Sequence, residues 1–288
     1  MEQLSYLNPD LILKILNDAL QEDIGPGDYS TLAAIDKSTQ GQAALIIKDS
    51  GVFAGVEVAK QVFAIIDDHL QVQSFLEDGT LVEPGKIAFS VSGNARSILS
   101  AERLVLNIMQ RMSGIATKTH KMNSLLTGTG VKLLDTRKTT PNFRAFEKWA
   151  VKIGGGENHR FALYDMIMLK DNHIDYAGGI SNAVAKTKKY LAENNLTLKI
   201  EVETRTLDEV NEALISGVDI ILLDNMGVEE LRKAVALVNN KCTTEASGGI
   251  SEENIKLIAA TGVDYISVGA LTHSYNSLDM SLKATLDK

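Results

Sequence analysis

Apolar and polar positions repeat with different periods in the first and second parts of this chain. Near the N-terminus, apolar residues recur every three or four positions in NPDLILKILNDALQEDIGPGD, which predicts a helix that Asn8 caps and that Gly25 ends. Residues 42–93 hold one helical stretch among the strand-like runs QAALIIKD, LQVQSFLED and KIAFSVSG. A long helical pattern follows over 96–126. These patterns predict an α+β unit that leads into a long helix.

After residue 130, short apolar runs alternate with helical stretches of about ten residues. Runs of this kind are typical of strands that are buried on both faces and that pair in parallel as βα units. Such a series predicts an α/β barrel that stops short of the eight units of a complete one. The runs are VKLLD (131–135), MIMLK (166–170), LKIEVE (198–203), DIILLD (219–224), TTEAS (243–247) and DYISVG (264–269).

Every predicted strand of the second part ends in a block of polar residues or glycines. In an α/β barrel the carboxyl ends of the strands share one rim, and active sites lie on that rim. A single block would mean little, whereas a block on each strand predicts a functional site. The blocks are Asp135-Thr136-Arg137-Lys138, Lys170-Asp171-Asn172-His173, Glu201 with Glu203, Asp224-Asn225, Ser247-Gly248-Gly249 and Gly269-Ala270.

Positive charge gathers at this rim although the whole chain is acidic. The 288 residues carry a formal net charge of -8 at pH 7, which argues against general affinity for nucleic acid or an anionic membrane. Residues 137–170 nevertheless hold seven Lys or Arg against three Asp or Glu. Because arginine binds carboxylate or phosphate through paired hydrogen bonds and lysine acts as a point charge, a local anion site is predicted.

Other residues at this rim indicate which kind of anion the predicted site would bind. Glycines after the last two strands let backbone N–H groups approach an anion, and these loops are the usual phosphate site of such barrels. Glu203 and Asp224 offer hard oxygen ligands on neighbouring strands, suited to Mg²⁺ or to ribose hydroxyls. The predicted ligand therefore has a phosphate, a sugar or metal, and a second acidic group.

Some residues have simpler interpretations. Arg144, Glu147 and Lys148 fall at helical spacing and are predicted to form a solvated helix face. His159, taken alone, could equally be a structural histidine. Cys242 is the only cysteine and is predicted to be a small buried side chain in a reducing compartment such as the cytoplasm. The start MEQLSYLNPD predicts no signal peptide, and no apolar run reaches the ~18 residues of a transmembrane helix.

The stretch over residues 135–174 reads DTRKTTPNFRAFEKWAVKIGGGENHRFALYDMIMLKDNHI. It resembles the signature of the quinolinate phosphoribosyltransferase family. The resemblance covers nearly the whole chain. The N-terminal domain of the family is similar to the stretches EDIGPGDYST and GVFAG. Its long connecting helix is similar to SAERLVLNIMQRMSGIAT, and its later strand ends are similar to EVE, LLDN, EASGGI and ISVGALTH. Asn142 stands where the family usually has glycine. Asparagine also tolerates a left-handed backbone, so we expect the turn to be kept.

The resemblance implies an N-terminal α/β sandwich followed by an incomplete α/β barrel of the type II phosphoribosyltransferase kind. On that basis residues 1–115 are assigned to the sandwich with its connecting helix, 116–272 to the barrel, and 273–288 to a segment that returns to the N-terminal domain. It also implies a Mg²⁺-dependent enzyme of NAD biosynthesis. Such an enzyme joins quinolinate to phosphoribosyl pyrophosphate, releases pyrophosphate and carbon dioxide, and leaves nicotinate mononucleotide. The family works as a homodimer with shared active sites, and higher assembly is left open.

The residues that the resemblance assigns to the two quinolinate carboxylates are mostly cations. They are Arg137, His159, Arg160, Lys170 and the partner's Arg103, with Thr136 beside them.

The resemblance assigns a second group to phosphoribosyl pyrophosphate. Lys138 would contact this cosubstrate, while Glu203 and Asp224 would hold its ribose hydroxyls and Mg²⁺; these three form the predicted catalytic set. The residues that would bind the 5-phosphate lie at the last strand ends. They are Ser247, Gly248, Gly249, Gly269 and Ala270, with His273 next to them.

Three other interpretations of the rim remain open. A related phosphoribosyltransferase could use the same phosphate site with nicotinate, or with another base as in the molybdenum-transport-associated paralogue, although a single carboxylate would not need so many cations. A Schiff-base aldolase would use Lys170, which would then have to be desolvated. A non-catalytic anion-binding protein would leave Glu203 and Asp224 without a task.

Overall fold

The computed structural model describes residues 7–285, which form two compact units. Among the described residues, unit 1 contains 7–120, 139–155 and 271–285, and unit 2 contains 121–138 and 156–270. The domain boundaries assigned from the sequence at residues 115 and 272 stay a prediction. Every helix within 7–285 falls short of the length or the apolarity that a bilayer span requires.

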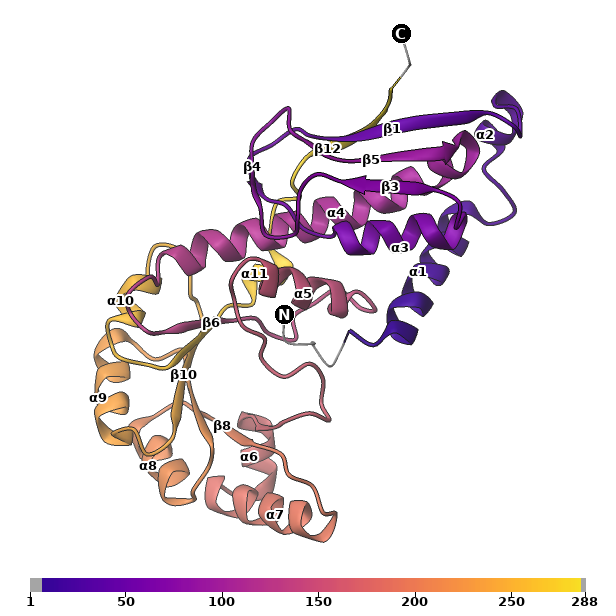
Figure 1. Ribbon diagram of the computed structural model, residues 1–288. Helices are drawn as coiled ribbons and strands as arrows, with labels where there is room; N and C mark the ends of the chain where they lie inside the picture. The colour runs from indigo at the N-terminus through magenta and orange to yellow at the C-terminus, as the bar shows by residue number, and fades with distance from the viewer. Residues whose placement is uncertain (1–6, 286–288) are drawn as a thin grey trace. The chain divides into compact units, whose positions relative to one another are not determined.

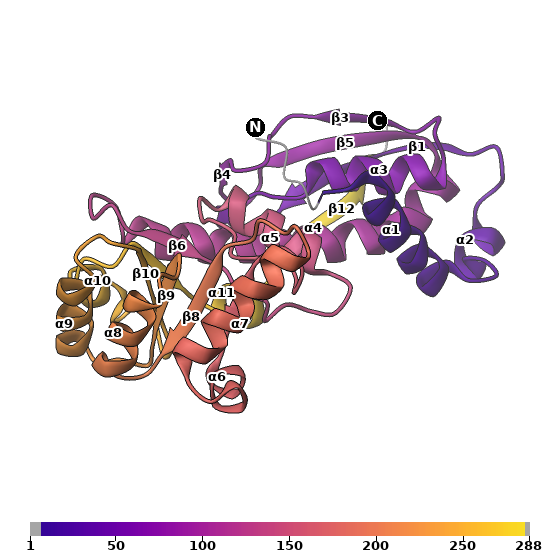
Figure 2. The same cartoon turned by 90° about the horizontal axis from the view of Figure 1, so that it is seen from below.

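Unit 1 is built on an antiparallel sheet with the strand order β12-β1-β5-β3. The strands are β1 (Gln40–Ile47), β3 (Gln71–Ser74), β5 (Ile87–Asn94) and β12 (Met280–Ala284). The C-terminal strand β12 pairs with β1, so that Leu282 lies opposite Leu45. The helices α3 (Val56–Ile66) and α4 (Ala95–Ser124) lie along one face of this sheet (Figures 1 and 2). The short strands β2 (Gly51–Val52) and β4 (Leu81–Val82) form a separate antiparallel pair.

The predicted first helix is confirmed as α1 (Pro9–Ile24), and α2 (Tyr29–Ala34) follows it. The Asn8 side chain caps α1 by accepting a hydrogen bond from the backbone N–H of Asp10. Gly25 ends the helix with a positive φ of 51°, a conformation that glycine adopts without a Cβ penalty. The apolar face of α1 buries Leu16 completely, so the 3.6-residue period identified the inward side correctly.

The predicted solvated face of α5 (Arg144–Ile153) is wrong for two of its three residues. Glu147 and Lys148 are fully buried. The carboxylate of Glu147 accepts hydrogen bonds from Arg111 on α4, at 3.0 and 2.7 Å, and from the Thr140 backbone N–H at 3.1 Å. A helical spacing of charges shows which residues share a face, but not whether a partner helix covers that face.

The turn before α5 behaves as expected. Asn142 has a φ of 62°, so asparagine keeps the left-handed turn in which the family usually has glycine.

Unit 2 contains the predicted parallel sheet, with the order β6-β11-β10-β9-β8-β7. The strands are β6 (Lys132–Leu134), β7 (Ile167–Leu169), β8 (Ile200–Thr204), β9 (Ile220–Asp224), β10 (Thr243–Ser247) and β11 (Tyr265–Ser267). β6 and β7 stand at the two ends of this order, as expected of an incomplete barrel. The predicted α/β fold class is confirmed.

The helices of unit 2 alternate with its strands. They are α6 (Asp171–Ala177), α7 (Ile180–Glu193), α8 (Leu207–Ile215), α9 (Val228–Val238) and α10 (Ile255–Ala259). A short helix, α11 (Ala270–His273), leads out of the unit. Both views show α8, α9 and α10 on one side of the strands (Figures 1 and 2). Because helices cover this outer side, the opposite side is where inward-facing side chains of the strands meet.

Candidate active site

Side chains from β8 and β10 meet on one side of the unit 2 sheet. His159 Nε2 lies 2.9 Å from Glu201 Oε2 and 3.5 Å from Glu245 Oε2, although β9 separates the strands that carry the two glutamates. Glu201 and Glu245 therefore point to the same side. Since residues two apart on a strand share a side, Glu203 and Ser247 point there as well, closer to the carboxyl ends of their strands. The site consequently has two levels.

The outer level, here called the mouth layer, consists of Lys170, Glu203, Asp224 and Ser247. Lys170 Nζ lies 3.8 Å from Glu203 Oε2, and the Ser247 hydroxyl donates to Asp224 Oδ1 at 2.7 Å. Burial raises the pKa of Glu203, Lys170 opposes this rise, and the charges of Asp224 and Asp171 add to it. Neighbouring carboxylates are stabilised by a cation or by hydroxyl donors placed between them. The structure thus brings the predicted Glu203 and Asp224 together.

The predicted cations include one guanidinium with an unused donor. Arg160 Nη1 donates to the Met166 carbonyl at 3.1 Å, while Arg160 Nε is buried and has no hydrogen-bond partner in the described part of the chain. Burial lowers the pKa of Arg160 and the neighbouring positive charge of Arg137 lowers it further, whereas the charges of Glu201 and Asp165 oppose this fall. Two guanidinium groups at close range repel each other unless an anion lies against them. Arg137 and Arg160 thus remain the predicted residues for binding an anionic ligand.

The other predicted cations lie nearer to water. The Lys138 side chain is exposed, and its backbone N–H donates to the Thr136 hydroxyl at 3.0 Å in the turn after β6. The side chain of Lys170 is 49% exposed. Both lysines can therefore move to meet a charged substrate.

The turn after β10 requires glycine. Gly248 has a φ of 92°, and a Cβ added to it would lie 2.1 Å from the Asn225 side-chain oxygen. Gly249 also has a positive φ, of 59°, but space is open around the position of its missing Cβ. Gly269 and Ala270 follow β11, the next strand along the chain. The predicted phosphate residues thus lie at the ends of adjacent strands, which is the usual place for a phosphate in such sheets.

The inner level, here called the buried layer, consists of Asp135, His159, Glu201 and Glu245. Asp135 is fully buried, and its Oδ1 accepts a hydrogen bond from the His159 backbone N–H at 2.9 Å. Burial, followed by the charge of Glu201, raises the pKa of Glu245 to about 7. Sequence analysis missed Glu245. The signal was present, because Glu245 precedes Ser247 by two residues on the same predicted strand, as Glu201 precedes Glu203.

Two predicted residues belong to unit 1 and not to the unit that holds the others. Arg103 is exposed on α4, and His273 is exposed at the end of α11, where its Nδ1 lies 2.7 Å from the Ser274 hydroxyl. Their part in the site stays a prediction.

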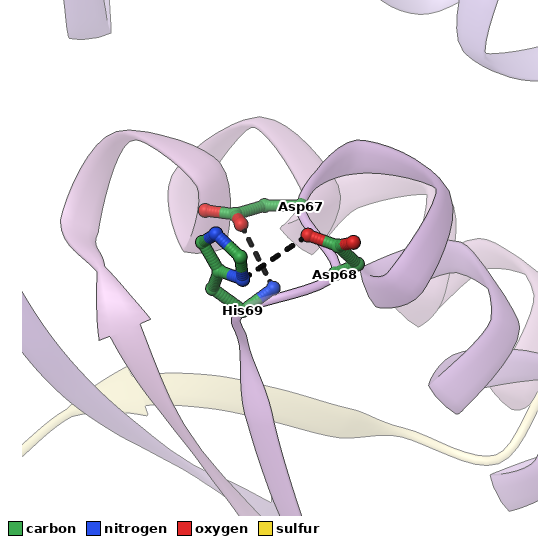
Figure 3. Close-up of side chains that lie close together, drawn as sticks. All are labelled: Asp67, Asp68 and His69. Carbon is green, nitrogen blue, oxygen red and sulfur yellow. Dashed lines mark hydrogen bonds and ion pairs between the residues drawn. The ribbon is translucent and has the colours of Figure 1, made fainter.

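A second group of acids and histidine lies in unit 1 at the turn between α3 and β3 (Figure 3). Asp67 accepts hydrogen bonds from the His69 backbone N–H at 3.0 Å and from the Ser97 hydroxyl at 2.9 Å. His69 Nδ1 lies 3.2 Å from Asp68, and both of these side chains are more than four-fifths exposed. The contacts with His69 are those of a local turn, and the Ser97 contact ties this turn to α4.

Comparison with known proteins gives matches over both parts of the chain. The profile for "Quinolinate phosphoribosyl transferase, N-terminal domain" matches residues 28–113, and the profile for its C-terminal domain matches residues 115–283. A rice (Oryza sativa subsp. japonica) protein named "Nicotinate-nucleotide pyrophosphorylase [carboxylating], chloroplastic" is 47% identical over 93% of this chain and 76% of its own length. A Bacillus subtilis protein named "Probable nicotinate-nucleotide pyrophosphorylase [carboxylating]" is 41% identical over 95% of this chain and 93% of its own length.

Solved structures show the same likeness. NadC from Streptococcus pyogenes superposes with a TM-score of 0.91 at 42% identity, covering 97% of this chain and 99% of that one. The nicotinate-nucleotide pyrophosphorylase from Francisella tularensis also gives 0.91, at 40% identity, over 96% and 97% of the two chains. With two family profiles that together cover most of its length and relatives above 40% identity, the chain belongs to the quinolinate phosphoribosyltransferase family.

Proposed function

We propose that this protein transfers the phosphoribosyl group of phosphoribosyl pyrophosphate to the ring nitrogen of quinolinate in NAD biosynthesis. The products are nicotinate mononucleotide, pyrophosphate and carbon dioxide. The observation that carries the proposal is the buried, unpartnered Nε of Arg160 beside a second guanidinium, on the sheet side that also bears Glu203 and Asp224. A dicarboxylate fits the guanidinium groups, and a ribose fits the carboxylates. Relatives named as carboxylating enzymes support the same assignment.

Quinolinate would place a carboxylate against Arg137 and Arg160. Arg137 and Arg160 disfavour each other electrostatically, and a carboxylate placed against them would accept the unused Nε–H of Arg160. Lys170 supplies a mobile charge on the Glu203 side of the site. Holding the ring in this way fixes the nitrogen relative to the sugar, which removes much of the entropic cost of bringing two substrates together.

The chemistry then requires charge stabilisation and no enzyme nucleophile. The ring nitrogen forms a bond to the ribose C1 while the bond from C1 to the pyrophosphate oxygen breaks, and the leaving group keeps the electron pair. The role assigned to Lys138 is to stabilise the charge of the departing pyrophosphate. In the alkylated ring, position 2 lies next to a positive nitrogen. That nitrogen stabilises the electron pair left on the carbon when carbon dioxide departs, and a proton then takes the vacant position.

The residues of the mouth layer suit Mg²⁺. Glu203 and Asp224 offer carboxylate oxygens, the ligands that this ion prefers, and Glu203 has a pKa raised by burial and by nearby acids. A bound Mg²⁺ would neutralise charge on the pyrophosphate. Glu203 and Asp224 would hold the ion or the ribose hydroxyls, and the Ser247 hydroxyl would keep the Asp224 carboxylate in place.

The aldolase alternative is disfavoured by the surroundings of Lys170. A Schiff-base lysine needs a desolvated amine, whereas half of the Lys170 side chain is exposed and its Nζ lies near the Glu203 carboxylate. Lys170 is therefore better suited to bind an anion.

One experiment tests the proposed function. Purified protein, phosphoribosyl pyrophosphate and Mg²⁺ are mixed with either quinolinate or nicotinate, and the mononucleotide and released carbon dioxide are measured. We expect product from quinolinate, a kcat/KM at least roughly a hundredfold lower for nicotinate, and loss of turnover with chelator. Equal kcat/KM for the two bases would contradict the proposal, as would a carbonyl substrate trapped on Lys170 by borohydride. Full activity in the presence of a chelator would show that the reaction does not need Mg²⁺.

We also infer a homodimer in which the partner's Arg103 contacts quinolinate. Family membership and the exposed position of Arg103 on α4 support this inference. Arg103→Ala and Lys138→Ala homodimers should each be nearly inactive. After random subunit exchange, half of the dimers are mixed and each has one intact site, so activity should return to at most roughly a quarter of wild type. If exchange is verified by mass and no activity returns, Arg103 acts within its own chain.

We also propose a cytoplasmic location for this protein. It is supported by the presence of only one cysteine, Cys242, which leaves no intrachain disulfide. The rice relative is named as chloroplastic, so the location differs within the family. Cell fractionation with an antibody against this chain would decide the compartment.

A further inference from the structure

The polar block that follows β7 ends in a histidine that the proposed reaction does not use. Lys170 is the first residue of this block and directly precedes α6, whereas His173 is the third residue of that helix. The His173 side chain is exposed, yet its Nδ1 lies 3.0 Å from the backbone nitrogen of Lys170. Because a backbone N–H can only donate, the ring nitrogen is the acceptor. His173 thus holds the backbone of a residue that is predicted to bind substrate.

The place of β7 in the sheet explains why Lys170 needs such a partner. Among the described residues, β7 pairs with β8 alone and stands at the end of the strand order. The Ile167 N–H donates to the neighbouring chain of β8 at 3.0 Å, and the Asp171 nitrogen, on the same side, lies 3.4 Å from Glu203 Oε1. Since N–H groups alternate between the two edges of an extended chain, that of Lys170 points to the open edge. The His173 ring provides the acceptor there.

The backbone of Lys170 is therefore held from two sides, while its side chain is not. Its carbonyl accepts the Ile174 N–H at 3.0 Å, and its N–H is bound by the His173 ring. The side chain is 49% exposed, and its Nζ lies 3.8 Å from Glu203 Oε2, which is longer than a hydrogen bond. The far end of Lys170 is loosely held, so its reach depends on where the backbone starts.

Histidine differs from the usual residue at this position in a way that suits the site. At the third residue of a helix, the side chain that accepts such an N–H is typically Glu or Gln. A glutamate here would add a negative charge where the charges of Asp171 and Asp224 already act on Glu203. That charge would compete with an anionic substrate for the Lys170 ammonium. The ring nitrogen supplies an acceptor without a negative charge.

We propose that His173 is a positioning residue for Lys170. By accepting the Lys170 N–H at the open edge of β7, it holds the backbone from which the ammonium reaches a substrate carboxylate. That this carboxylate belongs to quinolinate rests on the proposed function. The Lys170 charge acts on bound substrate before and during the reaction alike, so losing its position should weaken binding more than it slows turnover.

Two substitutions at 173 form a matched pair. Asparagine carries its Oδ1 where histidine carries Nδ1, so His173→Asn keeps an acceptor, whereas His173→Leu has the same branching and no acceptor. Leucine is also the better helix former, so helix stability alone would favour it. In calorimetry we expect His173→Leu to weaken quinolinate binding roughly fivefold or more, and His173→Asn to stay within about twofold of wild type.

Two controls show that the effect is local. In both variants, kcat and the KM for phosphoribosyl pyrophosphate should stay within about twofold of wild type. Tyr176→Leu removes a ring that is 91% exposed on the same helix, and it should leave quinolinate binding unchanged. Equal binding by His173→Leu and His173→Asn would overturn the proposal, as would a loss in kcat as large as the loss in affinity.

A double-mutant cycle shows whether His173 acts through Lys170. In the Lys170→Ala background, His173→Leu should cause at most about a twofold further loss of quinolinate affinity, because the ammonium that it positions is gone. The same fivefold loss in both backgrounds would mean that His173 acts elsewhere. If Lys170→Ala binds quinolinate too weakly to measure, the exchange experiment below decides.

Hydrogen exchange of the Lys170 amide, followed by NMR, tests the contact without substrate. We expect slow exchange in the wild type and in His173→Asn, and exchange at least roughly tenfold faster in His173→Leu. Exchange at the same rate in the wild type and His173→Leu would show that the ring does not hold this N–H, and would overturn the proposal.

Failures of the two proposals remain distinguishable. If the wild-type protein binds no quinolinate, the proposed function is wrong, and the exchange rates alone decide whether His173 holds the Lys170 backbone. If the wild type binds and converts quinolinate and His173→Leu binds it equally well, the proposed function stands and the role of His173 is refuted.

Discussion

The mouth layer and the buried layer of unit 2 use the same residue types for different tasks. Glu203 and Glu201 are two residues apart on β8 and point to the same side, yet Glu203 lies near a half-exposed lysine and Glu201 against a buried imidazole. A charge near water can exchange partners when substrate arrives, because solvent screens it in the meantime. A buried charge has to keep its partner, because losing that partner costs several kcal/mol or more. Depth along β8 therefore separates a carboxylate that is open to a ligand from one that is held by a buried neighbour.

The largest effect is expected at the mouth, where a single charge faces the leaving group. Lys138→Ala should lower kcat by about a hundredfold or more, because it removes stabilisation that grows as pyrophosphate departs. Quinolinate binding, measured by calorimetry, should remain detectable, since the buried layer and Arg160 are untouched. Lys132→Ala is a matched control, because Lys132 is also exposed and lies at the start of β6, before the turn. Normal turnover of Lys138→Ala would remove Lys138 from the site.

An intermediate effect is expected in the buried layer, and it concerns stability. The pKa of Glu245 is raised from 4.5 to about 7. At a pH between these two pKa values, the folded protein therefore binds more protons than the unfolded chain. Its contribution to stability is present below about pH 4.5 and is lost as the pH rises through 7. For an isolated group, the lost free energy of unfolding approaches roughly 3 kcal/mol. Because Glu245 interacts with Glu201 and His159, the three groups share this pH dependence.

Glu245→Gln should remove this pH dependence. Relative to wild type, the variant should gain stability between pH 5 and pH 8 in urea unfolding experiments. Glu253→Gln, an exposed change of the same kind, should run parallel to wild type. A wild-type protein that grows more stable relative to Glu245→Gln as the pH rises would show that Glu245 is ionised throughout.

The difference between the layers also shows what the sequence could predict. Strand ends with charged residues were recognisable, because short apolar runs that alternate with helices predict parallel strands, which places Glu203, Asp224 and Ser247 on one rim. The spacing of Glu245 from Ser247 repeats that of Glu201 from Glu203, but its partner His159 lies far away in the sequence, so no local pattern showed that the two side chains meet. Glu147 was misjudged for a similar reason. The packing of α5 on α4 depends on tertiary contacts, which helical spacing does not encode.

The smallest effect is expected at the exposed turn of Asp67, Asp68 and His69, which has the same residue types as the buried layer (Figure 3). Water already solvates Asp68 and His69, so their contact at 3.2 Å contributes little. Asp68→Asn and His69→Ala should therefore leave kcat, both KM values and, to within about 2 °C, Tm unchanged. Titration with Zn²⁺, followed by calorimetry, should give the same heats for wild type and His69→Ala, because the Asp67 carboxylate is already engaged by the His69 N–H and the Ser97 hydroxyl. A binding event that disappears in His69→Ala, or a clear drop in kcat/KM in either variant, would mean that burial is not what separates a functional cluster from a turn.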